Sequence, residues 1–374
     1  MVYEIGALPL QDLLPAIGRA EDRLARLDEA VRRSPAGAGF IERGHFVDAT
    51  ANMWILGELV HIEDLVLHDA HMGIRAPTHE LTIAHAILRS RRRIVDADPN
   101  WAISMSGIIS LAGLMSDENG GSLGQKTDRV GEGAWGVENV GTDSLAEDFA
   151  AIDALLDRSQ RLLDQVTPKA TTAASSKRAS LMVGDLVIRD ADWDEQERLL
   201  RWRHVIKDVE YFPAALAAAL LYDAWSAIDP MQRQVWLGGQ LASAYLRSRG
   251  KVTSHLPAFN VGLKAISRDR RRAPARPTRL IAFLDAMSAA ADAGMKEVAR
   301  LSLAREQMER TLRDRRSTSN LPAVIELVLS HPMVSTPMIA KAAGVTNRSA
   351  LNLIAELRVR EMTGRGRYRA WGVV

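Results

Sequence analysis

The sequence predicts a mostly α-helical protein, with a helical body followed by a small winged helix-turn-helix domain. Apolar residues recur at three- and four-residue spacing through most of the chain, and strand-like alternation is scarce before the C-terminus. The last fifty-odd residues carry short helical patterns separated by Pro and Gly, followed by alternating arginines. A length of 374 residues with 47% hydrophobic residues allows two or three domains with buried cores.

The body begins with a predicted amphipathic helix at 12–33, which the Ser-Pro-Ala-Gly segment after it ends. A long helix is expected at 45–71, and another at 80–95, where Thr78 can act as the N-cap. The same spacing of apolar residues predicts further helices at 193–209, 214–228, 231–249 and from 280 to about 313.

Changes in composition divide the chain into four regions. Residues 116–141 are Gly-rich and polar and are expected to form a loop, a helix is expected at 144–166, and a low-complexity linker follows at 167–180. A basic, proline-broken connector lies at 268–278, and the polar segment 315–320 is a natural boundary. The predicted domains are an N-terminal helical region (1–115), a loop, helix and linkers (116–180), a helical core with its connecting helix (181–316) and the winged helix-turn-helix (317–374).

Three short helices are predicted after residue 320, at 322–329, 337–343 and 347–359. Pro322 stands at the start of the first helix, where its missing N–H costs nothing. Thr336 is the expected N-cap of the second helix and Thr346 that of the third, with Gly344 between them where a tight turn needs a positive φ. This is the spacing of a helix-turn-helix.

The third helix is the expected recognition helix. The side chains that lie off its apolar face near the N-terminus are Asn347, Arg348, Ser349 and Asn352. These residue types bond base edges and phosphates in the major groove of DNA. The other expected DNA-binding residues are Thr336, Thr346, Arg365, Arg367, Tyr368 and Arg369.

The segment 362–371 predicts a β-hairpin, or wing. Arg365, Arg367 and Arg369 alternate with small or aromatic residues, Tyr368 among them, so that period-two geometry places the arginines on one face. From residue 321 onward there are seven Lys or Arg and three acidic residues, a local charge of +4, whereas the whole chain carries only +2. Such a local excess is typical of a module that meets phosphates.

Composition excludes several other classes of protein. Cysteine is absent, which excludes a disulfide framework, thiolate catalysis and a cysteine-ligated zinc site. No apolar run reaches the roughly 18 residues of a membrane span, and the first residues do not form a secretory signal. A cytoplasmic location without membrane partners is therefore expected.

The stretch 214–264 has the layout of a helix, a short loop, a second helix and a further apolar segment. Its landmarks are Ile228-Asp229-Pro230-Met231, the helix at 241–250 and Leu256-Pro257-Ala258-Phe259. In this layout it resembles the core of Fic-domain proteins, which transfer AMP onto hydroxyl groups. Residues 48–58 are similar to that family's N-terminal helix, and a C-terminal winged helix is common there. The resemblance covers about two thirds of the chain and implies a degenerate Fic-like core at 181–316.

The catalytic motif of the Fic family is absent. In that family a His is the general base, an acid holds Mg²⁺ and a Gly/Asn/Arg segment holds the phosphates. The matching positions here are Asp229, Arg233 and 234–237 (QVWL), and Pro230 alone is kept. Loss of the base, the metal ligand and the phosphate clamp leaves no transfer mechanism, so we expect no catalytic residue, no cofactor and an inactive scaffold. The whole chain also resembles an uncharacterised group of plasmid-borne bacterial helix-turn-helix proteins.

Other clusters have two interpretations each. His61, His68 and His71 recur on one helix face and are weak candidates for a metal site, with an ordinary polar surface as the alternative. Residues 124–127 (GQKT) come close to a phosphate-binding loop, but Gln125 breaks the required Gly-Lys pair and a flexible loop is favoured. The basic runs at 89–93 and 268–272 are either solvated faces or additional phosphate contacts.

These patterns predict a sequence-specific double-stranded DNA-binding protein, a transcriptional or replicon regulator. A homodimer is expected because one small module binds DNA weakly, and the helical body could also bind a protein partner. One alternative is a divergent nucleotidyl (AMP) transferase that uses the histidine-rich helix. The other is a protein-interaction or antitoxin-like scaffold whose winged helix contacts protein.

Overall fold

The computed structural model of the chain describes residues 3–72, 76–119, 193–310, 320–362 and 369–373. The chain divides into two compact units, one formed by 1–121 with 194–374 and the other by 122–193. Only Trp193 of the second unit is described. The remainder of the predicted Gly-rich loop beyond residue 119, the helix at 144–166, the linker at 167–180 and the GQKT segment therefore lie outside the described residues.

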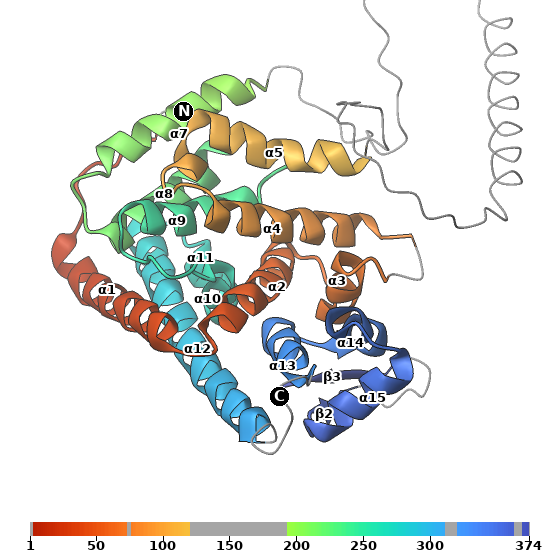
Figure 1. Cartoon of the computed structure of the whole chain (residues 1–374). Helices are drawn as coiled ribbons and strands as arrows, with labels where there is room; N and C mark the ends of the chain where they lie inside the picture. The colour runs from red at the N-terminus through yellow and green to blue at the C-terminus, as the bar shows by residue number, and fades with distance from the viewer. Residues whose placement is uncertain (1–2, 73–75, 120–192, 311–319, 363–368, 374) are drawn as a thin grey trace, which may run out of the picture. The chain divides into compact units, whose positions relative to one another are not determined.

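The first unit is built almost entirely of α-helices, which confirms the predicted fold class (Figure 1). Its N-terminal part contains α1 (Leu10–Arg33), α2 (Gly37–Leu56), α3 (Ile62–Asp69), α4 (His79–Asp96), a 3₁₀ turn η1 (Trp101–Ile103) and α5 (Met105–Asn119). After the undescribed segment come α7 (Glu195–Asp208), α8 (Ala214–Ile228), α9 (Leu237–Ser248), α10 (Phe259–Ala265), α11 (Arg268–Arg271) and the long α12 (Arg276–Arg310). None of the helices in the described part of the chain combines the length and apolarity needed to cross a membrane.

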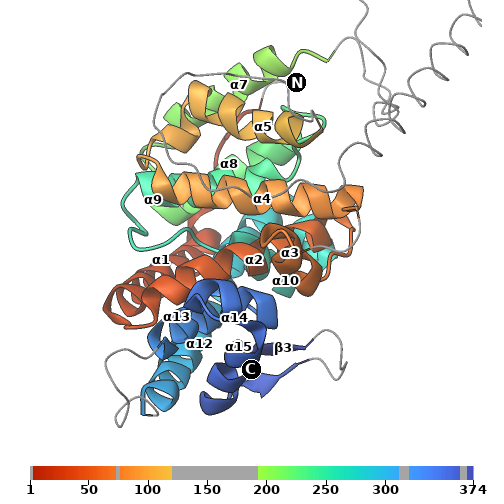
Figure 2. The same cartoon turned by 45° about the vertical axis from the view of Figure 1, so that its right-hand side comes forward.

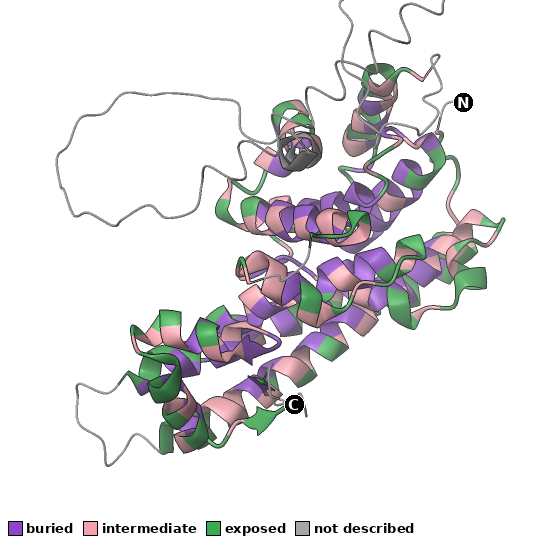
Figure 3. Ribbon diagram, turned by 90° about the vertical axis from the view of Figure 1, so that its right-hand side faces the viewer, coloured by how far each residue is buried: buried purple, intermediate pink, exposed green. Residues whose placement is uncertain are grey.

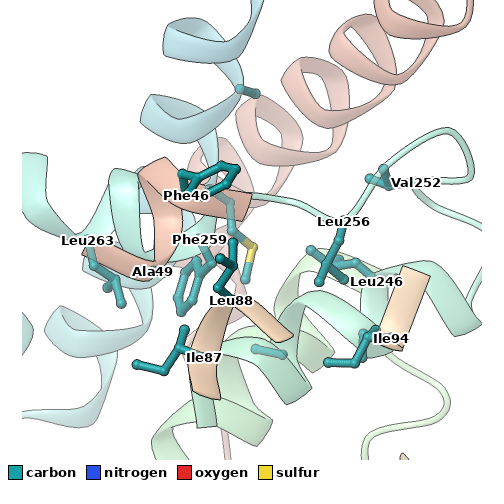
Figure 4. Packing of buried hydrophobic residues seen from close by; sticks show 14 of the residues in the cluster. Phe46, Ala49, Ile87, Leu88, Ile94, Leu246, Val252, Leu256, Phe259 and Leu263 are labelled. Atoms are coloured by element: carbon teal, nitrogen blue, oxygen red, sulfur yellow. The ribbon is translucent and has the colours of Figure 1, made fainter. Parts of the chain in front are cut away.

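The core lies where these helices meet. Helix α8 reads AALAAALLYDAWSAI and is buried along almost its whole length, because small alanines let α7, α9 and α12 approach it closely. Figure 4 shows Phe46 and Ala49 of α2 lying beside Ile87 and Leu88 of α4 and Phe259 of α10. Purple, buried positions run along the inner faces of the helices in Figure 3, and green positions cover their outer faces.

A buried ion pair stabilises the packing of α2 against α4 and α10. Asp48 pairs with Arg91, and its carboxylate also accepts hydrogen bonds from the backbone N–H of Asn260 at 2.9 Å and of Val261 at 3.2 Å. Arg91 donates in addition to the carbonyl oxygen of Leu256 at 3.1 Å. Each charge of this pair is therefore both paired and hydrogen-bonded inside the core.

Four sequence predictions of local structure were wrong. The predicted helix at 45–71 is two helices, since α2 ends at Gly57, whose φ of +97° forms a left-handed C-cap where Glu58 N–H donates to Met53 O at 2.9 Å. The predicted helix at 231–249 begins only at Leu237, after a loop. The basic connector at 268–278 contains α11 and the first turn of α12, and α5 extends to Asn119 into the predicted loop.

The C-terminal part forms the predicted winged helix-turn-helix (Figure 2). It contains α13 (Leu321–Ser330), β1 (Val334–Ser335), α14 (Thr336–Ala343), α15 (Asn347–Glu356), β2 (Arg360–Glu361) and β3 (Ala370–Gly372). The strands form an antiparallel sheet in the order β1-β3-β2, in which Trp371 lies opposite Val334 on one side and Glu361 on the other. Strand β1 was not predicted, because two residues are too few for an alternating pattern.

Candidate nucleic-acid interface

The turn between α14 and α15 has the geometry that the sequence predicted. Gly344 adopts a φ of +62°, and the N–H of Val345 donates to Ala340 O at 2.9 Å, which closes the end of α14. Ile339 from α14 and Ala350 and Ile354 from α15 are buried against each other and α13. This apolar contact holds α15 at a defined position, with its opposite face in solvent.

Only one of the two predicted N-caps is confirmed. Thr346 precedes α15, and its Oγ1 accepts a hydrogen bond from Ser349 N–H at 3.3 Å, which confirms it as the cap. Its hydroxyl also lies 3.1 Å from the Ser349 hydroxyl. Thr336 is not a cap: it is the first residue of α14, and Ser335 holds the N-cap position without a side-chain hydrogen bond. Strand β1 extends the backbone up to Ser335, so that the helix starts one residue earlier than predicted.

The first turns of α15 present the predicted recognition residues to solvent. Asn347, Arg348, Ser349 and Asn352 are all exposed. The Arg348 guanidinium forms no ion pair with any described residue. The positive end of the helix dipole lies at the same place, so an anion meets both the dipole and the arginine here. The contact of these side chains with DNA stays a prediction.

The wing is described only at its base. Arg365, Arg367 and Tyr368 lie outside the described residues, so their predicted role stays a prediction. Arg369 is described: its guanidinium pairs with Glu361 at 2.7 Å and lies 5.2 Å above the Trp371 ring. The hydrogen bonds from Arg369 lower the pKa of Glu361. Arg369 therefore brings less net positive charge to the wing than the sequence alone suggested.

Three further cations lie on the surface of this module, and reasoning on motifs missed them. Lys341 on α14, Arg358 after α15 and Arg360 in β2 are exposed and form no ion pair with the residues that the structure describes. In the sequence, only the net charge of the segment indicated that these cations could contribute to the interface. Arg358 adopts a φ of +53°, unusual for a non-glycine residue, at the point where the chain leaves α15 for the wing.

A buried arginine of the body holds the winged helix in place. Arg43 on α2 donates to four backbone carbonyl oxygens of the winged helix at 2.7 to 3.4 Å, those of Val328, His331, Pro332 and Val373. Its Nε lies 3.0 Å from a carboxylate oxygen of Glu297 on α12. A guanidinium has five N–H donors, and all five of Arg43 have a partner. No sequence pattern pointed to this residue.

Other contacts complete this junction. A Cβ added to Gly39 of α2 would lie 3.0 Å from both Cβ and O of Leu329, so the two backbones approach as closely as a glycine permits. On α12, Arg300 donates to Val373 O at 2.6 Å, and Arg305 pairs with Glu326 of α13 at 2.6 Å. The winged helix is thus packed on α2 and α12.

The histidine-rich segment does not come together as a metal site. His61 and His71 are exposed at opposite ends of α3, and His71 lies beyond the helix with a φ of +56°. The ring of His68 lies 4.7 Å from that of His85, and His85 Nε2 is 3.2 Å from Asp69. Asp69 in turn pairs with Arg92, so these groups form an ionic network. In the described ranges no three His, Asp or Glu side chains are placed to hold a metal ion.

The positions compared with the Fic motif lie between α8 and α9. Asp229 is the left-handed C-cap of α8, with a φ of +48°, and burial raises its pKa. Trp236 and Leu237 are buried where that motif has its phosphate-binding residues, and Asn52 Nδ2 donates to Trp236 O at 3.0 Å. Trp236 and Leu237 are thus packed into the core, whereas Arg233 and Val235 are exposed, and the Fic resemblance itself stays a prediction.

Comparison with known proteins gives one family match within the helical body and a second match to the winged helix. Residues 187–313 match a family described as "Protein of unknown function (DUF1612)", and residues 321–374 match a family described as "HTH DNA binding domain". The chain is 44% identical, over the full length of both proteins, to the "Uncharacterized protein y4cF" of Sinorhizobium fredii (strain NBRC 101917 / NGR234). The chain therefore belongs to the same family as y4cF, and it carries a C-terminal helix-turn-helix DNA-binding domain.

Proposed function

We propose that the protein is a sequence-specific double-stranded DNA-binding regulator of transcription or of a replicon. The observation that carries this proposal is the solvent-facing start of α15, where Asn347, Arg348, Ser349 and Asn352 are exposed on a helix capped by Thr346. Arginine can bond guanine and asparagine can bond adenine through two hydrogen bonds each in the major groove. In this proposal α15 enters that groove, and the wing contacts the adjacent phosphates through Arg365, Arg367 and Arg369.

In the same proposal the helical body is an inactive, Fic-like scaffold that dimerises. Buried Trp236 and Leu237 occupy the place of a phosphate clamp, which supports the absence of AMP transfer. Dimerisation would double the number of base contacts and match them to two half-sites about one helical turn apart. Sedimentation or light scattering at micromolar concentration, with and without DNA, tests the dimer; a monomer in both conditions contradicts it.

The central test measures the affinity of the purified full chain for duplex DNA by fluorescence anisotropy in a series of salt concentrations. The duplexes are the native upstream region and a random sequence. Arg348→Ala should weaken binding to a preferred native site by about 1–3 kcal/mol and reduce the preference over random DNA. The triple variant in which Arg365, Arg367 and Arg369 are changed to Ala should weaken binding to every duplex and lower the salt slope by about 2–3, because Arg369 is partly neutralised by Glu361.

The matched control changes Arg33, Lys207 and Lys296 to Ala, three exposed cations of the helical body. Because it removes the same charge, it should leave the salt slope and the site preference close to those of the wild type. Failure of the wild type to bind any duplex at low salt would overturn the proposal. Binding that depends equally on both sets of cations would indicate nonspecific attraction instead of recognition by the winged helix.

A further inference from the structure

A cavity of about 520 Å³ lies at the junction between the helical body and the winged helix. The body contributes mainly apolar side chains to it, among them Leu24, Leu27 and Phe40. The winged helix contributes Pro332, Met333 and Val373. This volume falls in the range of sites that bind small organic molecules, and such sites are mostly apolar with a few placed polar groups.

The charged groups of the lining leave little attraction for an ionic ligand. Arg43 and Arg300 both pair with Glu297, at 3.0 and 2.6 Å. Glu63, the remaining charged residue of the lining, would repel an anion. Burial lowers the pKa of His255 to about 4, so this imidazole is neutral at pH 7. A largely apolar and uncharged molecule therefore fits this cavity best.

His255 supplies one unused hydrogen-bonding atom. The residue lines the cavity and is 3% exposed. Its Nε2 has no hydrogen-bond partner in the described part of the chain, and neighbouring side chains cover this atom. Its Nδ1 lies 3.0 Å from the Ser254 hydroxyl, which is itself 2.7 Å from a carboxylate oxygen of Asp28. Because the carboxylate can only accept, the serine donates to it and accepts from His255 Nδ1–H. Nε2 then carries a lone pair and needs a donor.

We propose that this cavity binds an uncharged, mainly apolar small molecule that donates a hydrogen bond, from a hydroxyl or N–H group, to Nε2 of His255. The donor reaches Nε2 when the side chains that cover this atom move aside. The ligand contacts both walls, so it binds the arrangement in which the winged helix is docked on the body. A ligand that prefers one arrangement shifts the population toward it. Occupancy of the cavity therefore stabilises the docked winged helix.

The probe for the first test is N-phenyl-1-naphthylamine, a neutral apolar amine whose fluorescence rises in apolar surroundings and whose N–H can donate. The full chain should bind it with saturation. Val47→Trp should weaken binding by about tenfold or more, because Val47 lines the cavity and is 37% exposed, so the larger ring has room to occupy the space. Leu14→Trp, at an exposed position of α1 that does not line the cavity, is the matched control.

A second variant tests the hydrogen bond. His255→Phe keeps an aromatic ring beside Phe40 and removes the acceptor, so affinity for the amine should fall about threefold to tenfold. The N-methylated probe has no donor, and its affinity should be the same for both proteins. Equal affinity of both proteins for the amine would overturn the role of His255. Absence of saturable binding by the wild type, or equal binding by Val47→Trp, would overturn the site.

Hydrogen exchange measures the coupling without DNA. The probe should slow amide exchange in α13 of the wild type at least about twofold and leave that of Val47→Trp unchanged. Unchanged exchange in the wild type at a saturating probe concentration would overturn the coupling. None of these measurements uses DNA, so they stand if the proposed DNA binding fails.

Discussion

Asp28 shows how the surroundings of one residue decide its charge. It is buried on α1, and its carboxylate accepts hydrogen bonds from the backbone N–H groups of Thr253 at 2.8 Å and Ser254 at 2.7 Å. Burial opposes ionisation, but these bonds and those from the two hydroxyls prevail and lower the pKa of Asp28 to about 2. The ionised carboxylate thereby fixes the loop that carries His255.

The pKa of Asp28 predicts a defined pH dependence of stability. Because the folded-state pKa of about 2 lies below the ordinary value of 3.8, the carboxylate stabilises the fold above about pH 4 and loses this effect as the pH falls toward 2. Asp28→Asn should therefore be less stable at neutral pH and lose about 2 kcal/mol of the acid-dependent stability of the wild type. Urea unfolding across this pH range measures the difference.

The control for this prediction is Asp22→Asn, which removes an exposed carboxylate on the same helix. Its acid unfolding should follow that of the wild type closely, since exposed ion pairs contribute little. Parallel pH curves for the wild type and Asp28→Asn would contradict the assigned role of Asp28.

Long-range polar contacts were beyond prediction from the sequence. Asp28 and Ser254 are separated by 226 positions, and Arg43 and His331 by 288, so no local spacing relates them. Asp28 and Arg43 also fit ordinary helices, where Arg and Asp are commonly solvated. Asn347 and Arg348 were predictable as exposed because the periodicity of their own helix places them opposite its buried face.

At the scale of elements, helices with clear ends were predicted well and those without were not. Helix α8 spans the predicted 214–228, between Pro213 and a left-handed Asp229. The long predicted helix at 45–71 overlooked Gly57, although a glycine after an apolar run is a typical stop signal. Apolar residues continue on both sides of this break, so periodicity alone does not reveal it.

The turn of the helix-turn-helix gives a prediction at this scale. Gly344→Ala should destabilise the winged helix by about 1–2 kcal/mol, because a Cβ at a φ of +62° strains the backbone although nothing lies within 4 Å of it. Gly18→Ala is the matched control, since Gly18 lies inside α1 with equally open space and no positive φ. It should stabilise the protein by about 0.5–1 kcal/mol. Thermal unfolding that shows the same sign for both variants would contradict this account.

At the scale of the molecule, the described body and winged helix belong to one compact unit. The composition of the sequence predicted a domain boundary at the polar segment 315–320 and therefore suggested two separate modules. The contacts of Arg43, Arg300 and Arg305 add a polar connection that the local composition does not encode. Movement of the winged helix thus requires these bonds to break together.

Arg43→Met tests this connection. It removes the donor to the carbonyl groups of Val328, His331 and Pro332, so the free energy of unfolding should fall by about 3–5 kcal/mol. Glu297 and the carbonyl group of Val373 keep Arg300 as a partner. Amide exchange in α13 should become faster than in α8, far from the junction. Arg26→Met removes an exposed arginine paired with Asp22 and should change stability by less than about 0.5 kcal/mol. Similar losses in the two variants would argue against the proposed connection.

The cavity and the outer face of α15 have no residue in common. The cavity uses Pro332, Met333, Met362 and Val373 of the winged helix, whereas the exposed polar positions of α15 lie at 347–352. Mutations can therefore alter one surface while selection preserves the other. Under the two proposals made above, relatives would be able to diverge in the DNA they read while keeping the same small-molecule preference, and the reverse, because different residues would set the two specificities.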